Sequence, residues 1–410
     1  MLCYIWFRYN ERGMAMLRYF LAAYTVFRRM LRQICRNIGE RFEIWFQVIY
    51  ERLKYRGKKT KWIWKNVKLS KEQRRAIDKF YKENYGKRIP YTYHRLFTGF
   101  TGNFDVKYIP EMLYAPYVER FSTDFSYSNV FTNKNTLAVF ARGLNVKMPQ
   151  NIIMCNAGKY YDQDFNNITL AEAEQLLHNA GEVFVKNTTE SCGGQGCAIA
   201  EFINGIDTKT NLSVAQTLSS LGANYCVQEL LVCHESIRKI YPNSANTFRI
   251  ITYILEGEIY HCPVIIRIGQ GGAYKDNASA GGMFIAVDDD GTLHKSAFTE
   301  YREEYTVHPD TNFVFEGAKI EHVDKAIALA KRLQAAIPQV AVVNWDFTID
   351  ESGEPVLIEA NMKNNVQSGS VWLPQMAHGK GAFGDNTEKV LQYIQRANKM
   401  SFTKRKNFKM

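Results

Sequence analysis

The sequence lacks closely spaced cysteines. Its 410 residues include eight, and none forms a C-x-x-C pair or lies at a Cys/His spacing that suits zinc. Several lie in apolar, strand-like runs, such as Cys226 in YCVQELL and Cys262 in YHCPVII. We therefore expect reduced, buried thiols in a cytosolic protein.

Long apolar runs are also missing. Near the start, the longest stretch without a charge runs only from Tyr19 to Phe27, whereas a membrane span needs about 20 residues. No small-residue cleavage site follows an apolar core, so we expect no signal peptide. At 46% hydrophobic and 13% aromatic residues, the composition is that of a globular protein, with length for two or three subdomains.

Negative charge is scarce in the first 75 residues, which hold 19 Lys or Arg and 5 Glu, a net charge of +14 against +11 for the whole chain. Residues 14–55 have apolar residues at helical spacing, and we expect Gly39 to break this run. A lysine-rich segment with Trp62 and Trp64 follows, a mixture typical of contact with an anionic membrane surface. The alternative is helices that pack on the protein's own core. No nucleic-acid partner is expected, because no RNA- or DNA-binding motif surrounds these aromatics.

Helix-like and strand-like patterns alternate from Phe131 onward. Before that, Ser70 predicts the start of a helix over 70–90, and residues 91–131 are expected to be irregular. An amphipathic pattern predicts a helix over 321–336. The expected strands are 183–186, 197–202, 225–231, 247–255, 258–269, 283–288, 340–350 and 355–362.

A glycine-rich turn follows a strand that ends in lysine. Glycines let backbone N–H groups approach an anion closely, and lysine adds a point charge, so such a hairpin suits phosphate. It is not a P-loop, because no G-K-[ST] follows, and it is not a Rossmann turn, because the next element is a strand. The alternative is a flexible turn without a ligand. The candidate residues are Lys186, Gly193, Gly194, Gln195 and Gly196.

Two carboxylates and an amide come close together on two apolar strands. Glu359 and Asn361 are two residues apart and share a face, and Asp346 lies at a plausible cross-strand position on the preceding strand. These hard oxygen ligands suit Mg²⁺. The alternative is a solvated sheet face.

Two further groups are less specific. The segment Gln228–Glu229–Leu230–Leu231 offers backbone groups to an adenine edge, and Glu235 suits ribose hydroxyls. Arg249 and Arg267 lie on paired strands, with Lys275 beyond them, and arginine matches phosphate or carboxylate bidentately. The alternative for these cations is surface salt bridges.

The order of these groups resembles the ATP-grasp superfamily. Its first phosphate-binding lysine starts a helix, which here matches Lys134, and its second ends a strand, which matches Lys186. More closely, about residues 70–400 resemble the sugar-transfer-associated ATP-grasp family, found with surface-polysaccharide genes. The stretches that carry this resemblance are QELLVCHESIRKIYPNSANTFRIITY, IIRIGQGGAYKDNASAGGMFIAVDDDG and NWDFTIDESGEPVLIEANM. Asn133 precedes the first lysine, at a position where the family usually has Asp. Asn187 follows the second lysine, at a position where the family often has Pro.

The resemblance implies an α+β ATP-grasp fold, in which two α+β subdomains hold ATP between them, with a basic N-terminal helical segment. The expected divisions are a basic amphipathic segment at 1–75, a connecting region at 76–131, a small lid subdomain at 132–233 and a large subdomain with the metal site at 234–400.

The resemblance also implies an ATP-dependent carboxylate–amine ligase that uses two Mg²⁺ ions and an acylphosphate. Arg267 and Arg249 would stabilise developing charge. The reaction would amidate a sugar acid, or join an amino acid to a sugar, in cell-surface polysaccharide biosynthesis. The residues expected on the substrate side are Asn277, Gly281, Gly282, His234 and Lys275.

We expect a cytoplasmic protein, peripheral at the inner face of the membrane, whose residues 1–68 contact anionic lipid or a lipid-linked glycan. Two alternatives remain. One is a phosphotransferase that shares the same nucleotide residues, and the other is a non-catalytic, membrane-docked nucleotide-binding module.

Overall fold

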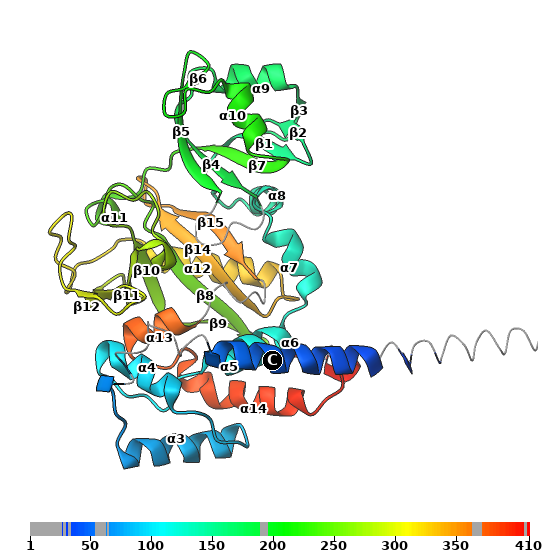
Figure 1. The fold of residues 1–410 in the computed structure, drawn as a ribbon, viewed down its shortest axis with the longest axis vertical. Coiled ribbons are helices and arrows are strands. Elements are labelled where there is room, and N and C mark those ends of the chain that lie inside the picture. Colours follow the sequence, from blue (N-terminus) through cyan, green and yellow to red (C-terminus); the bar gives the residue numbers. More distant parts are fainter. Residues whose placement is uncertain are drawn as a thin grey trace, which may run out of the picture.

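The computed structural model describes residues 27, 30–31, 34–53, 63, 65–188, 196–362, 371–405 and 408–410. Three parts follow one another along the longest axis (Figure 1). A small sheet lies at one end, a larger sheet lies in the middle, and a base of helices lies at the other end. Among the described helices, none is both long and apolar enough to cross a bilayer.

The small sheet has seven antiparallel strands in the order β3-β2-β1-β7-β4-β5-β6. Helices α9 (Leu170–Leu177) and α10 (Val214–Ser220) pack on it, and each begins with a capping box, at Thr169 and Ser213. The strands are β1 (Asn151–Asn156), β2 (Lys159–Tyr161), β3 (Asn167–Ile168), β4 (Gly181–Asn187), β5 (Cys197–Ile203), β6 (Ile206–Asp207) and β7 (Asn224–Glu229).

The large sheet has eight antiparallel strands, with β13-β12-β11-β10-β8-β14-β15 in order and β9 paired to β8. The expected turn at Glu256–Gly257 joins β8 to β9. Pro263 separates β9 from β10, where the sequence suggested one strand. The strands are β8 (Phe248–Leu255), β9 (Glu258–His261), β10 (Val264–Ile268), β11 (Met283–Val287), β12 (Leu293–Phe298), β13 (Glu304–Tyr305), β14 (Val342–Ile349) and β15 (Pro355–Asn361).

Both faces of the large sheet are covered, which explains its continuous apolar strands. On β8, Ile250 packs in the core with α12 (Val323–Ala336), whereas Ile251 packs in the core of the helical base. Helix α8 (Lys134–Gly143) contributes Leu137 to the α12 core. The expected domain divisions stay a prediction. Four of the described thiols, Cys155, Cys226, Cys233 and Cys262, are buried as expected, whereas Cys35 is exposed.

The helical base combines segments far apart in the sequence. Helix α14 packs along α3, and α13 packs along α4. Ser70 caps α3 with Gln73 as expected. The helices are α3 (Lys71–Asn84), α4 (Thr92–Thr101), α13 (Trp372–His378), α14 (Thr387–Asn398) and α15 (Phe402–Arg405).

Two expectations for this region are wrong. Residues 91–131 are mostly helical, not irregular, because their aromatic side chains are buried in the base, and Tyr91 starts α4 without a side-chain cap. Residues 34–53 form one continuous helix through Gly39, since packing on one face outweighs the weak helix preference of a single glycine. The helices between α4 and α8 are α5 (Glu111–Leu113), a π-helix (Tyr114–Glu119), α6 (Arg120–Ser122) and α7 (Phe125–Phe131).

The turn between β14 and β15 depends on one buried carboxylate. Asp350 Oδ1 accepts hydrogen bonds from the backbone N–H groups of Ser352 and Glu354, and Oδ2 pairs with Lys147. Burial alone would raise the pKa of Asp350, but the bonds from Lys147 and Ser352 outweigh it and lower the pKa to about 2. The ionised carboxylate therefore holds the two strands in register.

We predict that Asp350→Asn lowers the free energy of unfolding by about 1.5–3 kcal/mol at pH 7, because it removes charge-assisted bonds to a buried turn. Because the folded-state pKa lies below the unfolded value of about 3.9, this stabilisation is present at higher pH and is lost as the pH falls toward 2. Urea unfolding at several pH values measures the difference. Asp290→Asn, at an exposed turn, is the control, and an equal loss in both variants contradicts the prediction.

Candidate active site

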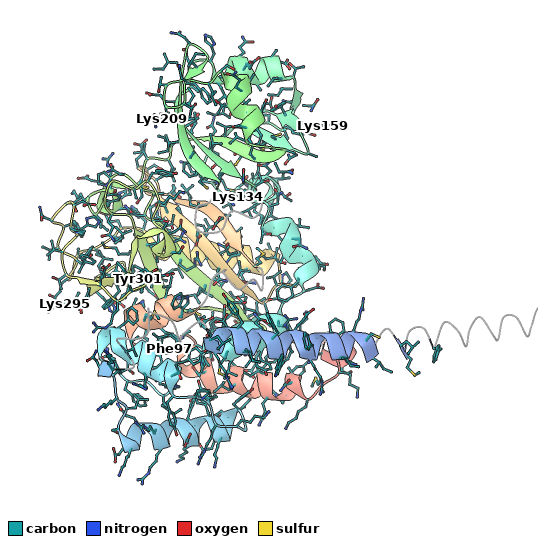
Figure 2. The ribbon with its side chains drawn as sticks, viewed as in Figure 1. Phe97, Lys134, Lys159, Lys209, Lys295 and Tyr301 are labelled. Atoms are coloured by element: carbon teal, nitrogen blue, oxygen red, sulfur yellow. The ribbon has the colours of Figure 1, made fainter. Side chains whose placement is uncertain are left out.

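A cavity of about 690 Å³ lies between the small and the large sheet. Strands β4, β5 and β7 line one side, and strands β10, β14 and β15 with the loop after β10 line the other. Lys134 lies where the two sheets meet (Figure 2). Eleven of the residues singled out in the sequence line this cavity: Lys134, Lys186, Gln228, Glu229, Leu230, Leu231, Arg267, Lys275, Asn277, Asp346 and Glu359.

A row of charged residues crosses three neighbouring strands of the large sheet. Arg249 on β8 lies directly opposite Asp346 on β14, and Asp346 lies directly opposite Glu359 on β15. Side chains opposite each other on antiparallel strands share a face and lie about 5 Å apart at Cβ. The cross-strand position expected for Asp346 and Glu359 is therefore confirmed.

Asp346 is almost completely buried between two arginines. Arg249 donates bidentately, with Nε 2.5 Å from Oδ1 and Nη2 3.1 Å from Oδ2, and Arg267 Nη2 lies 3.1 Å from Oδ2. Burial raises the pKa of Asp346, and the two guanidinium groups oppose this rise. A buried carboxylate of this kind needs both partners, because an uncompensated buried charge is strongly destabilising.

Glu359 faces the cavity from the end of this row, with 27% of its side chain exposed. Asn361 donates to Oε1 at 3.0 Å, and Lys134 Nζ lies 3.4 Å from Oε2. Burial opposes ionisation, but Lys134 and Asn361 outweigh it and lower the pKa of Glu359 far below its usual value. Asn361 also reaches Asp346 Oδ2 at 3.4 Å, so the three predicted metal ligands lie together.

Arg267 connects this row to the loop after β10. Its guanidinium contacts Thr247 and lies 3.8 Å from Asp276, whose Oδ2 accepts from the Thr247 backbone and hydroxyl. Burial tends to lower the pKa of Arg267, but the carboxylates of Asp276 and Asp346 raise it further above its usual value. Arg267 is therefore a fixed positive charge at the cavity wall.

Lys134 is positioned by the first turn of α8, as expected from the sequence. The Asn133 side chain caps this helix by accepting from the backbone N–H groups of Asn135 and Thr136. Asparagine therefore supplies the same capping oxygen as the aspartate that the family usually has.

Lys186 near the end of β4 is a buried cation of the cavity. It is only 3% exposed, and burial lowers its pKa. Among the described residues, no carboxylate forms an ion pair within 4.0 Å of its ammonium. A buried cation without a counterion is unfavourable, so this position suits an anionic ligand.

The hairpin after Lys186 is closed by a backbone bond. The Asn187 N–H donates to the Gly196 carbonyl at 3.1 Å, a bond that the proline often found at this position cannot make. Gly196 has a φ of 70°, and an added Cβ would lie 2.5 Å from Asn187 Nδ2. The expected phosphate contacts of Gly193, Gly194 and Gln195 lie outside the described residues.

An apolar region of the cavity was missed by the sequence analysis. Phe184 on β4 lies opposite Ile199 on β5, and both line the cavity. Their alternation with core residues was the available signal: Val183 and Val185 face the small core, so Phe184 and Lys186 face the other way. Leu230 and Val232 line the same cavity yet are 37% and 45% exposed, which suits a flat apolar ligand group.

Several candidate residues lie outside the cavity. Glu235 is exposed and pairs with Lys239 at 2.7 Å, at the start of α11 (Glu235–Arg238). His234 caps that helix, accepting from the Ser236 backbone, and its ring packs edge-on against His322. Their ribose-binding and substrate-binding assignments stay predictions.

Gly281 and Gly282 shape the loop after β10 and do not line the cavity. Gly281 has a φ of 97° and ends the 3₁₀ turn Ala278–Ala280. A Cβ on Gly282 would lie 2.5 Å from the Asp276 carbonyl oxygen, which no small shift would relieve. Asn277 and Lys275, by contrast, do line the cavity.

One family of known proteins matches more than half of the chain. A model described as sugar-transfer associated ATP-grasp matches residues 115–391. No curated protein matches the chain.

Solved structures are similar only distantly. D-alanyl-alanine synthetase A from Vibrio cholerae O1 biovar eltor is 13% identical, with 65% of this chain and 66% of that chain covered and a TM-score of 0.38. The ATP-grasp ligase PsnB, complexed with precursor peptide PsnA2 and AMPPNP, is 10% identical, with 67% and 62% covered and a TM-score of 0.37. N5-carboxyaminoimidazole synthase from Aspergillus clavatus is 12% identical, with 63% and 52% covered and a TM-score of 0.34.

The chain therefore spans about half to two thirds of the length of these structures. The family model decides the assignment, because it matches more than half of the chain. The α+β fold expected from the sequence is also confirmed. The chain belongs to the sugar-transfer associated ATP-grasp family.

Proposed function

We propose that this protein binds ATP with Mg²⁺ in the cavity between its two sheets and uses it to join a carboxylate to an amine. The observation that carries the proposal is the buried ammonium of Lys186, which lines the cavity without a carboxylate partner among the described residues. Lys134 and Arg267 line the same cavity. Three cations that converge on one cavity suit the phosphates of a nucleotide.

The rest of the cavity suits the remainder of ATP. Phe184, Ile199 and Val232 offer apolar surface for a base. Leu230 and Leu231 follow directly after β7, so their backbone groups are available beyond the end of the strand. We propose that adenine binds between these residues, as was expected for the segment Gln228–Leu231.

The predicted metal ligands fit Mg²⁺. Asp346, Glu359 and Asn361 supply hard oxygens, and the 3.4 Å between Glu359 Oε2 and Lys134 exceeds the usual length of a charge-assisted bond, about 2.7–2.9 Å. That oxygen therefore keeps capacity for a cation on the cavity side. When bound, Mg²⁺ would neutralise phosphate charge. The expected number of two ions stays a prediction.

In the proposed reaction, a substrate carboxylate oxygen attacks the γ-phosphorus of ATP, the bond to the β–γ bridging oxygen breaks, and ADP leaves. The amine then attacks the carbonyl of the acylphosphate, gives up a proton, and displaces phosphate. Arg267 lines the cavity and stabilises negative charge that develops there. Arg249 is absent from the lining and holds Asp346 from behind, which favours a positioning role.

The family description connects this chemistry to sugar transfer. We propose that the carboxylate or the amine belongs to a sugar acid, an amino acid or an amino sugar of a cell-surface glycan. Lys275 and Asn277, on the loop after β10, are the described cavity residues best suited to orient such a polar substrate.

The experiment that tests this function is a coupled assay for ADP and phosphate with Mg²⁺ and ATP, in which sugar acids and sugar nucleotides are screened against amino acids and amines. Release that requires both an acid and an amine is the expected result. Release with one acceptor and a stable phosphorylated product identifies a phosphotransferase, and ATP binding without turnover favours a non-catalytic module. Glu359→Gln should lower kcat by at least about 100-fold, whereas Glu354→Gln at the exposed turn should not.

Lys186 gives a second prediction with two opposite readouts. Lys186→Met should weaken ATP binding by about ten- to a hundredfold, because a charged partner of phosphate is lost. The same change should leave the melting temperature of the nucleotide-free protein unchanged or raise it, because burial disfavours the ammonium. Lys209→Met, at an exposed pair with Glu182, is the control. Unchanged ATP affinity in Lys186→Met would contradict the phosphate assignment.

We also propose that the helix at residues 34–53 docks on an anionic membrane surface. One side of this helix is held in the base by Ile44 and Gln47, which are buried. The other side presents large apolar side chains to solvent over roughly 120° of the helix, at 100° per residue. The apolar residues exposed within this arc are Ile34, Ile38, Phe42, Trp45, Phe46 and Leu53.

Charge complementarity favours lipid as the partner. Three arginines and one glutamate are exposed on this helix, Arg36, Arg41, Arg52 and Glu43, within a segment of net charge +14 at residues 1–75. Exposed apolar side chains flanked by arginine, with a tryptophan among them, are typical of interfacial helices. The expected contribution of Trp62 and Trp64 lies outside the described residues.

We predict that Phe42→Glu weakens sedimentation with vesicles of anionic lipid by about ten- to a hundredfold, the loss expected when one large side chain no longer inserts. Phe42 is 65% exposed, so the fold should be unaffected. Val314→Glu, at a residue 59% exposed away from this helix, should bind as the wild type does. The proposal is wrong if the unmodified chain does not sediment with these vesicles or if Phe42→Glu binds equally well.

A further inference from the structure

Three metal-ligating side chains meet on the large sheet away from the cavity. Asp288 directly follows β11, His294 lies on β12, and His378 is the last residue of α13. One ligand atom from each lies within 4.8 Å of those of the other two. None of the three lines the cavity, so this cluster is separate from the proposed nucleotide site.

His378 has a buried ring nitrogen without a hydrogen-bond partner. The residue is only 7% exposed, and its Nε2 lies 2.6 Å from the Val264 carbonyl oxygen. A carbonyl only accepts, so Nε2 carries the proton and Nδ1 is a bare acceptor. Nδ1 is buried without a hydrogen-bond partner. Such an atom is unfavourable unless it has a ligand.

The hydrogen bond that Nε2 donates to a carbonyl is also common in metal sites. A histidine that ligates a metal usually donates its other ring N–H to a carbonyl or a carboxylate, which fixes its tautomer and orientation. Val264 performs this function for His378 from the first position of β10.

The other two side chains can move toward this fixed ligand. His294 Nε2 lies 3.1 Å from Asp288 Oδ1, and 35% and 50% of their side chains are exposed. The rings of His294 and His378 meet edge-on, with centroids 4.9 Å apart. Ligand atoms around tetrahedral zinc lie about 3.3 Å apart, since each is about 2 Å from the ion. Small rotations of the two exposed side chains would close the remaining gap.

We infer that Asp288, His294 and His378 form a binding site for a divalent transition metal ion, most suitably Zn²⁺. Two imidazoles and one carboxylate are ligands that zinc prefers, with water completing the coordination. The turn also attracts cations, because Asp289 and Asp290 follow Asp288 directly. Bound metal would tie the end of α13 to the β11–β12 hairpin (Figure 1).

A second histidine cluster on the large sheet lacks this feature. His234, Glu321 and His322 also bring ligand atoms within 4.8 Å. However, His234 Nδ1 is already engaged by Ser236, at 2.9 Å from its hydroxyl. It therefore offers no buried, unpartnered nitrogen, and it serves instead as a comparison site.

The test uses the full chain without an affinity tag, stripped of metal with a chelator and titrated with Zn²⁺ against a chromophoric competitor. We expect His294→Ala and Asp288→Asn each to weaken the affinity for one zinc ion per chain by at least about tenfold. Even changes to residues that only hydrogen-bond to metal ligands have effects of that size. Both residues are partly exposed, so folding should survive. Co²⁺ should give the visible absorption of a four-coordinate site, which the variants should lose.

Two matched variants locate the effect. His261→Ala removes a neighbouring histidine whose Nε2 lies 3.2 Å from Asp289, and His322→Ala disrupts the second cluster. Both variants should still bind, with wild-type affinity, the zinc ion that His294→Ala binds more weakly. The inference is overturned if the wild type binds no zinc, or if His294→Ala and Asp288→Asn bind the same number of ions with unchanged affinity.

Discussion

The buried contact of Asp346 with Arg249 and Arg267 is the constraint on which the site depends. These three side chains come from β14, β8 and β10, so the ion pairs fix the register of three strands and the direction of each charged group. Removing one partner of a buried pair leaves an uncompensated charge, with a loss of about 3–5 kcal/mol. The large sheet therefore holds its charges in place before any ligand arrives, and such preorganisation is what electrostatic stabilisation of a reaction requires.

The charged side chains of the cavity are not all neutralised, and this difference distinguishes the two sides of the cavity. Asp346 is matched by two arginines and Glu359 by Lys134, whereas Lys186 on the opposite sheet has no carboxylate partner among the described residues. The small sheet thus contributes a buried lysine that forms no ion pair within 4.0 Å among the described residues, and the oxygen ligands Asp346 and Glu359 lie on the large sheet. On the proposed function, phosphates would bridge the two sheets and Mg²⁺ would bind at the large one.

The sequence predicted the parts of this site that depend on local spacing. Lys134 after a capping residue, Lys186 near the end of a strand and the face shared by Glu359 and Asn361 all follow from short-range rules. The pairing of Arg249 with Asp346 does not, because it requires β8 to lie beside β14, and these strands are almost 100 residues apart. Helix α4 was missed for a similar reason, since burial in the base stabilises it, without a side-chain cap. The cluster of His378 with Asp288 and His294 could not be predicted either, because no local spacing in the sequence relates His378 to the other two residues.

The large sheet also connects the two ends of the molecule mechanically. On the face that carries Arg249 and Asp346, Ile251 and Val342 belong to the core shared with the helical base. That core includes Ile44 of the helix at residues 34–53, whose opposite side is apolar and exposed. A membrane-docked helix would therefore set the orientation of the sheet, and with it the direction in which the cavity faces. Because side chains in a packed core transmit displacement with little loss, docking and access to a lipid-linked acceptor would be coupled by rigid packing rather than by a flexible linker.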